Sequence, residues 1–241
     1  MRAFIVVLIL FVLALFVFIS CKKGESNPVE SETLPTKGLI AYYPFNGNAN
    51  DESGKGNNGN VQGAILTADR FGKPNSAYYF NGVNAYIFIN SGFNFSNSSF
   101  TISVWAKRDV KGDYDCIIGQ GLGTTNSSLH IGFRDVAMQY KFTFAFYQND
   151  LDVPSQYSDL LLHNWICSYD VNTNVRKVYR DGVLVASDIS TADYAGSGSI
   201  YIGLHYIGNP SNFGGSIDDI RIYNRALTDA EIQQLYHEGG L

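Results

Sequence analysis

The chain has 241 residues and a net charge of −5, and 45% of its residues are hydrophobic. This length leaves room for one domain of about 200 residues with a sizeable core. Only 16% of the residues are charged and no basic run offsets the negative charge, so the composition excludes a surface built to bind nucleic acid.

The first 20 residues have the pattern of a secretory signal. Arg2 supplies a positive charge, and the apolar run that follows ends at Ser20, directly before Cys21. A charged start and an apolar core are typical of a signal peptide, and a small residue before a cysteine resembles a bacterial lipobox. We expect residues 1–20 to be a lipoprotein-type signal peptide and Cys21 to be lipidated. An uncleaved membrane anchor and plain secretion are the alternatives.

Residues 21–37 read as a flexible tether. They contain proline, glycine, serine, threonine and charged residues, and almost no apolar side chains that could pack. Acyl chains on Cys21 would hold the protein to a membrane, because each buried methylene contributes about 0.8 kcal/mol. The sequence therefore predicts a cell-envelope protein, lipid-anchored to the outer membrane or the cell surface.

The loop at residues 46–59 is crowded with asparagine, aspartate, serine and glycine. Such side chains close turns through local hydrogen bonds, which is one interpretation of the loop. The other interpretation is a site for a hard cation. Calcium takes about six to eight oxygen ligands from carboxylates, amides and the backbone, and Asp51 and Asn58 supply such oxygens.

From residue 38 to residue 241, short apolar runs alternate with clusters of turn residues, which is the all-β pattern. Strands are expected at residues 39–45, 77–80, 85–90, 99–107, 116–119, 128–133, 142–147, 165–169, 175–180, 183–186, 199–203 and 216–223. Asp181 and Gly182 form the two-residue turn of a hairpin. Because helices do not alternate with these strands, we expect two packed antiparallel sheets, with Trp105 and Trp165 in the core.

The end of the chain combines a strand, a turn and a capped helix. Ile220 and Ile222 alternate with polar residues at the period of a half-buried strand. Thr228 and Glu231 have the spacing of a capping box. The sequence therefore predicts one helix, at residues 228–237.

Five blocks in the chain, at residues 38–59, 80–87, 100–105, 178–182 and 214–231, resemble laminin-G-like, concanavalin A-like jelly rolls of bacterial surface proteins. The resemblance covers nearly all of the chain after residue 37. It implies a two-sheet antiparallel jelly-roll sandwich over residues 38–241 with one short C-terminal helix. It also implies a class of ligand rather than a named partner.

The resemblance implies a structural calcium ion as well. In that family, the opening loop and an aspartate of the last strand frequently hold calcium. On this chain the corresponding residues are Asp51, Asn58 and Asp218. A buried carboxylate at residue 218 must be paired or bound to a cation, because an isolated buried charge is very costly.

Two cysteines lie in expected strands, Cys116 and Cys167. They are either buried apolar thiols or a disulfide, since an external compartment permits disulfides. Neither has a cysteine or histidine at the spacing of a metal site, and the four histidines show no zinc spacing. The sequence therefore predicts no transition-metal site.

No catalytic pattern is evident. Glycosidases need two carboxylates beside the scissile bond, and the Glu-x-Asp-x-x-Glu pattern of the concanavalin-like hydrolases does not occur. Asp218 and Asp219 are neighbours, so in a regular strand they point to opposite faces and cannot act as a pair. We expect the chain not to be an enzyme, with a glycoside hydrolase or polysaccharide lyase as the lesser alternative.

A binding module is therefore the leading prediction, with carbohydrate as the expected ligand. Sugar sites on sandwiches combine aromatic faces with amide and carboxylate groups. The loops at residues 121–128, 149–159 and 205–213 supply these groups, and the candidate ligand-binding residues are Asn126, Tyr157, Tyr206 and Asn209. The alternative is an adhesion domain that recognises a cell-surface protein, which the sequence alone does not distinguish from a glycan-binding domain.

Overall fold

The computed structural model describes residues 34–238, apart from residues 111–113, 122, 136–139 and 208. The expected signal peptide, the lipidation site Cys21 and residues 21–33 of the expected tether lie outside the described residues. Among the residues that are described, no helix is long and apolar enough to cross a membrane.

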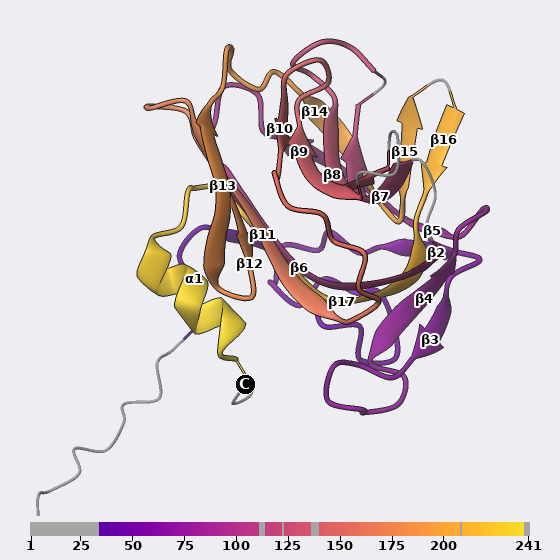
Figure 1. The fold of residues 1–241 in the computed structure, drawn as a ribbon. Coiled ribbons are helices and arrows are strands. Elements are labelled where there is room, and N and C mark those ends of the chain that lie inside the picture. Colours follow the sequence, from indigo (N-terminus) through magenta and orange to yellow (C-terminus); the bar gives the residue numbers. More distant parts are fainter. Residues whose placement is uncertain (1–33, 111–113, 122, 136–139, 208, 239–241) are drawn as a thin grey trace, which may run out of the picture. The chain divides into compact units, whose positions relative to one another are not determined.

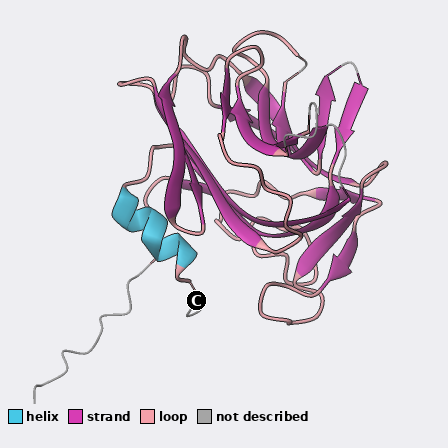
Figure 2. Ribbon diagram, in the orientation of Figure 1, coloured by secondary structure: helices cyan, strands magenta, loops and turns pink. Residues whose placement is uncertain are grey.

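Two antiparallel sheets make up most of the described chain (Figures 1 and 2). The eight-stranded sheet has the order β13-β12-β11-β6-β17-β4-β3, and β1 pairs with β17 beside this path. Its strands are β1 (Leu39–Tyr43), β3 (Ile65–Thr67), β4 (Ala77–Asn81), β6 (Phe100–Val110), β11 (His163–Asp170), β12 (Val175–Arg180), β13 (Val183–Ile189) and β17 (Gly214–Tyr223).

The seven-stranded sheet has the order β10-β9-β8-β7-β14-β5-β2. Its strands are β2 (Asn60–Gln62), β5 (Tyr86–Asn94), β7 (Tyr114–Gln120), β8 (Leu129–Arg134), β9 (Lys141–Ala145), β10 (Asp150–Asp152) and β14 (Ser197–Ile202). A separate hairpin consists of β15 (Leu204–Ile207) and β16 (Asn209–Asn212). The expected fold class, a two-sheet antiparallel jelly roll, is confirmed.

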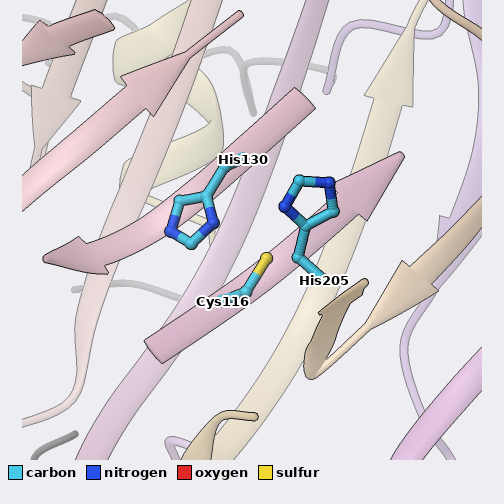
Figure 3. Close-up of side chains that lie close together, drawn as sticks. All are labelled: Cys116, His130 and His205. Atoms are coloured by element: carbon cyan, nitrogen blue, oxygen red, sulfur yellow. The ribbon is translucent and has the colours of Figure 1, made fainter. Parts of the chain in front are cut away.

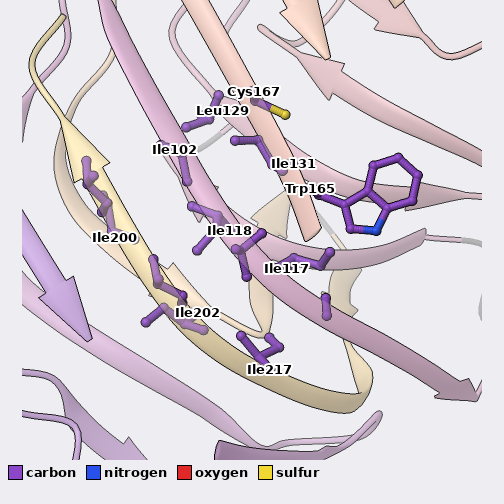
Figure 4. Packing of buried hydrophobic residues seen from close by; sticks show 14 of the residues in the cluster. Ile102, Ile117, Ile118, Leu129, Ile131, Trp165, Cys167, Ile200, Ile202 and Ile217 are labelled. Carbon is purple, nitrogen blue, oxygen red and sulfur yellow. The ribbon is translucent and has the colours of Figure 1, made fainter. Parts of the chain in front are cut away.

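The core lies between the two sheets, and both contribute to it (Figure 4). Along β6, Ile102 and Val104 are fully buried at alternate positions, as the strand period requires. Trp165 is 1% exposed and stacks on Phe142 with ring centroids 3.9 Å apart. Burying a large apolar side chain contributes about 1.5–3 kcal/mol, so these aromatic rings are a main source of stability.

Trp105 is buried, but it packs on the other side of the eight-stranded sheet. Its ring stacks on Tyr236, with centroids 6.1 Å apart, and the guanidinium of Arg70 lies 5.1 Å from its centroid. The sequence predicted burial of this tryptophan in the core. The structure instead places it under the C-terminal segment.

The single described helix, α1 (Asp229–Tyr236), begins with the predicted capping box. The Glu231 backbone N–H donates to Thr228 Oγ1 at 3.3 Å, and the Glu231 carboxylate accepts from the Thr228 N–H at 2.9 Å. Ile232 and Leu235 are buried against Ile166 and Tyr179. The helix therefore covers the outer face of the eight-stranded sheet, as Figures 1 and 2 show.

The hairpin β15–β16 packs on the outer face of the other sheet, over β7 (Figure 1). Gly119 of β7 makes this approach possible. A Cβ at that position would lie 2.5 Å from the Leu204 carbonyl oxygen and 2.9 Å from the Cβ of His205. Only a glycine lets the hairpin come this close.

Candidate functional site

A row of half-buried aromatic rings lies on the outer face of the seven-stranded sheet. It consists of Tyr86 and Phe88 on β5 and Tyr201 on β14, and we call it the aromatic strip. The ring of Tyr201 lies 5.9 Å from that of Tyr86 and 4.9 Å from that of Phe88, measured between centroids. All three side chains are half-buried, whereas Ile87 and Ile202, beside them in sequence, face the core.

Amide side chains flank the aromatic strip. Asn60 and Gln62 on β2 are exposed and pair in register with Phe88 and Tyr86. Asn90 at the other end accepts a hydrogen bond from Ser199 at 3.4 Å. Each amide offers both donors and acceptors. Ring faces beside amides are the combination that sugar sites on proteins use.

The aromatic strip is not among the sites predicted from the sequence. Its strand was expected at residues 85–90, where Tyr86 and Phe88 alternate with Ile87 and Ile89. Both faces of such a strand are apolar, so its period does not tell which face is buried. Asn90 continues the series of Tyr86 and Phe88 at every second residue, and its polar amide indicates that this face of the strand is the one turned to solvent.

Of the four expected ligand residues, Asn126 and Tyr157 lie near opposite ends of β9. Asn126 donates its backbone N–H to Tyr147 beyond one end of the strand, whereas Tyr157 donates to Tyr140 beyond the other. Tyr206 and Asn209 belong to the β15–β16 hairpin, where their side chains lie outside the description. The structure therefore does not bring Asn126 and Tyr157 into one site. Ligand binding by the four residues stays a prediction.

Both of the described candidates have structural contacts. The Asn126 amide oxygen accepts from the Asn149 amide at 2.8 Å, which ties two loops together. The Tyr157 ring is 8% exposed, packs edge-on against Trp165 at 5.0 Å and lies under the Arg180 guanidinium at 4.5 Å. Tyr157 therefore packs within the protein and presents little of its ring to a ligand.

A small pocket lies beside Tyr157, lined by the rings of Phe133, Tyr157 and Trp165 and by the polar groups of Asp159, His163 and Arg180. Its volume is about 10 Å³, which is room for roughly one water molecule. Asp159 accepts hydrogen bonds from His163 at 2.9 Å and from Arg180 at 2.7 Å. Burial acts to raise the pKa of Asp159, but these bonds outweigh it and the pKa is lowered. Asp159, His163 and Arg180 are thus paired with one another, and a sugar ring does not fit inside a space of this volume.

The opening loop is held by Asp51. Its Oδ1 accepts from the backbone of Tyr42 at 2.9 Å and of Ser53 at 2.8 Å, and its Oδ2 accepts from Asn57 at 2.9 Å. Asn58 Oδ1 accepts from the Asp51 N–H at 2.9 Å. Burial acts to raise the pKa of Asp51, but the hydrogen bonds prevail and lower it. This carboxylate joins the loop to β1 through backbone donors.

In the closing strand β17, the carboxylates of Asp218 and Asp219 both pair with the guanidinium of Arg70. Arg70 Nη1 lies 3.0 Å from Asp218 Oδ2, and Nη2 lies 2.9 Å from Asp219 Oδ2. The prediction that Asp218 and Asp219 point to opposite faces is wrong. Asp219 has φ 44°, and a bulge interrupts the pairing of β17 with β6 between Asp218 and Arg221. The irregular backbone lets both carboxylates reach one guanidinium.

These contacts do not fit the expected calcium site. The Asp51 carboxylate accepts three backbone N–H groups and Asn58 accepts a fourth, while Asp218 is neutralised by Arg70. Among the described residues, the one group of histidine, cysteine and acidic side chains that is close enough to hold a metal ion includes none of the three. A calcium ion shared by Asp51, Asn58 and Asp218 stays a prediction from the family resemblance alone.

Cys116 and Cys167 are both free and buried. Cys116 lies on β7 and Cys167 on β11, in different sheets. Burial raises the pKa of both thiols well above its usual value. The sequence left open whether these cysteines are buried thiols or form a disulfide, and in the structure they are buried thiols.

Several solved structures share this fold. Domain 4 of AbnA, an extracellular arabinanase from Geobacillus stearothermophilus, in complex with arabinotriose, is 21% identical with a TM-score of 0.66, and the match covers 82% of this chain and 98% of that chain. The binding domain of Paraclostridial Mosquitocidal Protein 1 is 18% identical with a TM-score of 0.66, covering 83% and 52%. Trypanosoma rangeli sialidase is 18% identical with a TM-score of 0.63, covering 85% and 33%. At these identities the likeness shows the fold alone.

The prediction that the chain is not an enzyme requires correction. It was based on the absence of one carboxylate pattern and on the opposite orientation of Asp218 and Asp219. The structures that share this fold include a sialidase and a domain of an arabinanase, and the two carboxylates converge on Arg70. Because one fold supports many kinds of site, a missing motif does not exclude catalysis on it.

The family itself is shown by sequence. A comparison with curated proteins gives no match. A family model described as the concanavalin A-like lectin/glucanases superfamily matches residues 81–233, which is more than half of the chain. The match includes β5, most of the core and the closing strand β17. The chain belongs to the concanavalin A-like lectin/glucanase superfamily.

Proposed function

We propose that this protein is a carbohydrate-binding module of a bacterial cell envelope and that the glycan lies on the aromatic strip. The observation that carries the proposal is the row of half-exposed rings of Tyr86, Phe88 and Tyr201 beside the exposed amides of Asn60 and Gln62. The ring faces offer apolar contact to the C–H face of a sugar, and the amides bind its hydroxyl groups.

The shape of the site determines which part of a glycan it can bind. The aromatic strip lies on the outer face of the sheet, and the described pocket beside Tyr157 holds only about 10 Å³. An open face suits the side of a glycan chain better than its end. Since little of the ligand is enclosed, we expect modest affinity per site.

The relatives support a sugar as the ligand class. The arabinanase domain in complex with arabinotriose is a separate domain, and this chain aligns to 98% of it. Another solved structure with this fold is a botulinum neurotoxin binding domain in complex with SialylT, at 15% identity. Their ligands differ, so they support carbohydrate in general and do not identify the sugar.

Anchoring at the envelope is part of the proposal and depends on the sequence. The apolar run that ends before Cys21, followed by the polar segment 22–37, supports an acylated cysteine and a flexible tether. Mass spectrometry of the N-terminal peptide tests it. A mature chain that keeps residues 1–20, or that has an unmodified Cys21, would contradict it.

A protein partner is the second candidate function, and one observation favours it. β13 is an edge strand of the eight-stranded sheet, and Val183, Leu184 and Ile189 on it are 64%, 48% and 71% exposed. An apolar edge strand is a surface on which another chain can add a strand. Tests of binding should therefore include a glycan arm and a protein arm.

A glycan panel decides between the two functions. Purified protein should bind at least one class of polysaccharide, and Tyr201→Ala should weaken that binding roughly tenfold, the change that about 1.4 kcal/mol produces. The matched control is Phe71→Ala, which removes an exposed ring (51% exposed) outside the aromatic strip. If Tyr201→Ala and Phe71→Ala bind glycans equally well, the aromatic strip is not the site. If only cell-surface protein is captured and Val183→Lys abolishes that capture, the second function holds.

A further inference from the structure

A buried cluster of two histidines and a cysteine lies between the seven-stranded sheet and the β15–β16 hairpin. Cys116 comes from β7, His130 from β8 and His205 from β15. Each offers one ligand atom, and the three atoms lie within 4.8 Å of one another. Figure 3 shows the Cys116 sulfur between the two imidazole rings.

Two of the ring nitrogens have no hydrogen-bond partner. His205 Nδ1 and His130 Nε2 are buried and unpaired among the described residues, and His205 is 1% exposed. A buried polar atom without a partner is costly and requires an explanation. A bound cation is one such explanation for His205 Nδ1, which faces Cys116 and His130 in Figure 3.

Contacts of Ser128 orient His205 as a ligand. The Ser128 hydroxyl donates to the Gln120 carbonyl at 3.2 Å and accepts from the Gly123 N–H at 3.1 Å. With its hydrogen on Gln120, Oγ accepts from His205 Nε2, which lies 2.8 Å away. The Nδ1 of His205 then carries a lone pair in the buried cluster. A hydrogen bond at the distal nitrogen is how proteins usually orient a metal-binding imidazole.

Both imidazoles are buried, His130 at 7% and His205 at 1% exposure. Neutral imidazole is the form of histidine that binds metals. The Cys116 sulfur has one weak contact, 3.9 Å from the Ile131 carbonyl oxygen, so its lone pairs are available.

Two glycines build the cluster. Gly132 lies opposite Cys116, and a Cβ there would be 2.1 Å from the Asp115 carbonyl oxygen, so glycine is required for the bulge of β7 between Cys116 and Ile118. Gly119 pairs with His130 and admits β15 on the same face. The bulge and the close approach of the hairpin bring the three ligands together.

We propose that Cys116, His130 and His205 form a site for a cation that prefers sulfur and imidazole, of the class of Zn²⁺ and Cu⁺. Thiolate and imidazole are the donors that these ions select. Metal–ligand bonds of about 2.0–2.3 Å place neighbouring ligand atoms about 3.5 Å apart. Side-chain rotations that move the ligand atoms by about 1 Å would bring all three within bonding distance of one ion. Binding replaces the thiol proton of Cys116, which is released to solvent.

This proposal differs from the prediction made from residue spacing, which was that the chain has no transition-metal site. It is independent of the proposed glycan binding, since no residue of the aromatic strip is a ligand. Its consequence is structural: the ion fixes the β15–β16 hairpin to β7, beside the strand that carries Tyr201.

The test uses the full chain with Cys21→Ser as background, so that the remaining thiols are Cys116 and Cys167. After treatment with reductant and chelator, the protein is titrated with Zn²⁺, with Cu⁺ and with Ca²⁺, and metal content and melting temperature are measured. We expect one Zn²⁺ or one Cu⁺ per chain, a higher melting temperature and no effect of Ca²⁺. The two titrations give the relative affinity of the site for Zn²⁺ and for Cu⁺.

The variants assign the ligands. Cys116→Ser and His205→Gln should lose at least tenfold in affinity, whereas Cys167→Ser, which removes the other buried thiol, should bind as before. A variant of a core residue can fail to fold. The protein with all three ligands intact is therefore also titrated with Co²⁺. Binding of Co²⁺ to a thiolate gives a charge-transfer band in the near ultraviolet, which reports on Cys116 without a substitution there. The absence of this band together with no uptake of Zn²⁺ or Cu⁺ would overturn the proposal, as would equal uptake by folded Cys116→Ser.

Discussion

Arg70 and Asp219 form a buried ion pair, with Nη2 2.9 Å from Oδ2, although 149 residues separate them. Arg70 lies between β3 and β4, and Asp219 lies at the bulge of β17. The same guanidinium pairs with Asp218 at 3.0 Å. Arg221 lies 2.7 Å from the other carboxylate oxygen of Asp219, so two arginines compensate the two neighbouring acids.

Removing that arginine should be strongly destabilising. Arg70→Leu leaves Asp218 and Asp219 buried with less compensation, and breaking a buried pair in this way costs about 3–5 kcal/mol. Urea denaturation measures the loss in the free energy of unfolding. Lys73→Ala is the control on the same loop, because Lys73 is exposed, and it should change the free energy by less than about 0.5 kcal/mol. Equal effects of the two substitutions would mean that Arg70 does not hold the closing strand.

Asp51 should contribute more to stability than its neighbour. Asp51→Ala leaves three buried or half-buried backbone N–H groups without their acceptor, and we expect a loss of about 2–3 kcal/mol. Glu52→Ala is the matched control, since Glu52 is exposed. Thermal unfolding of both variants gives the comparison. The result would contradict the structure if Asp51→Ala unfolded at the temperature of the wild-type protein.

Calcium should have little effect on this loop. Backbone donors occupy the Asp51 carboxylate and Arg70 neutralises Asp218, so we expect equal melting temperatures in calcium and in EDTA once transition metals have been removed. A ligand bound only to the folded state at one hundred times its dissociation constant would add about 2.7 kcal/mol. A calcium-dependent rise that Asp218→Ala abolishes would restore the calcium site expected from the resemblance.

Glu231 should make stability depend on pH in the acidic range. Hydrogen bonds from Arg225, above all, lower the pKa of Glu231 from 4.5 to about 2. Because the folded state has the lower pKa, the stabilisation is fully present above pH 4.5 and is lost as the pH falls toward 2. Glu231→Gln should flatten the stability profile between these pH values, as measured by urea denaturation at each pH. An unchanged profile would show that the Arg225–Glu231 pair contributes nothing measurable in solution.

The strands that the sequence predicted are those with a clear alternating pattern, and each of them is present within a few residues of its expected ends. The sequence missed short strands such as β2, β10 and β16, whose residues are Asn-Val-Gln, Asp-Leu-Asp and Asn-Pro-Ser-Asn. Three or four residues with at most one apolar side chain have no measurable period. They become strands because a neighbouring strand supplies the hydrogen-bond partners: β5 for β2, β9 for β10 and β15 for β16.

The candidate sites were harder to predict than the fold. Cys116, His130 and His205 follow no spacing rule, because a bulge in β7 and the close approach of a hairpin bring them together. Asp218 and Asp219 share Arg70 for a similar reason, a positive φ within a strand. In both cases irregular backbone geometry determines the contacts. A prediction that assumes regular strands cannot find these contacts.

The place of β17 has a consequence for how the protein reaches its native state. β17 comes after all the other described strands, yet it lies inside a sheet, hydrogen-bonded to β6 and β4 and also to β1. During synthesis from the N-terminus, one edge of β6 and one edge of β4 therefore stay unpaired until β17 emerges. Pairing over such long sequence separations is slow, and open edges invite association with other chains. A growing chain of this protein should need protection by a chaperone until its final strand is inserted.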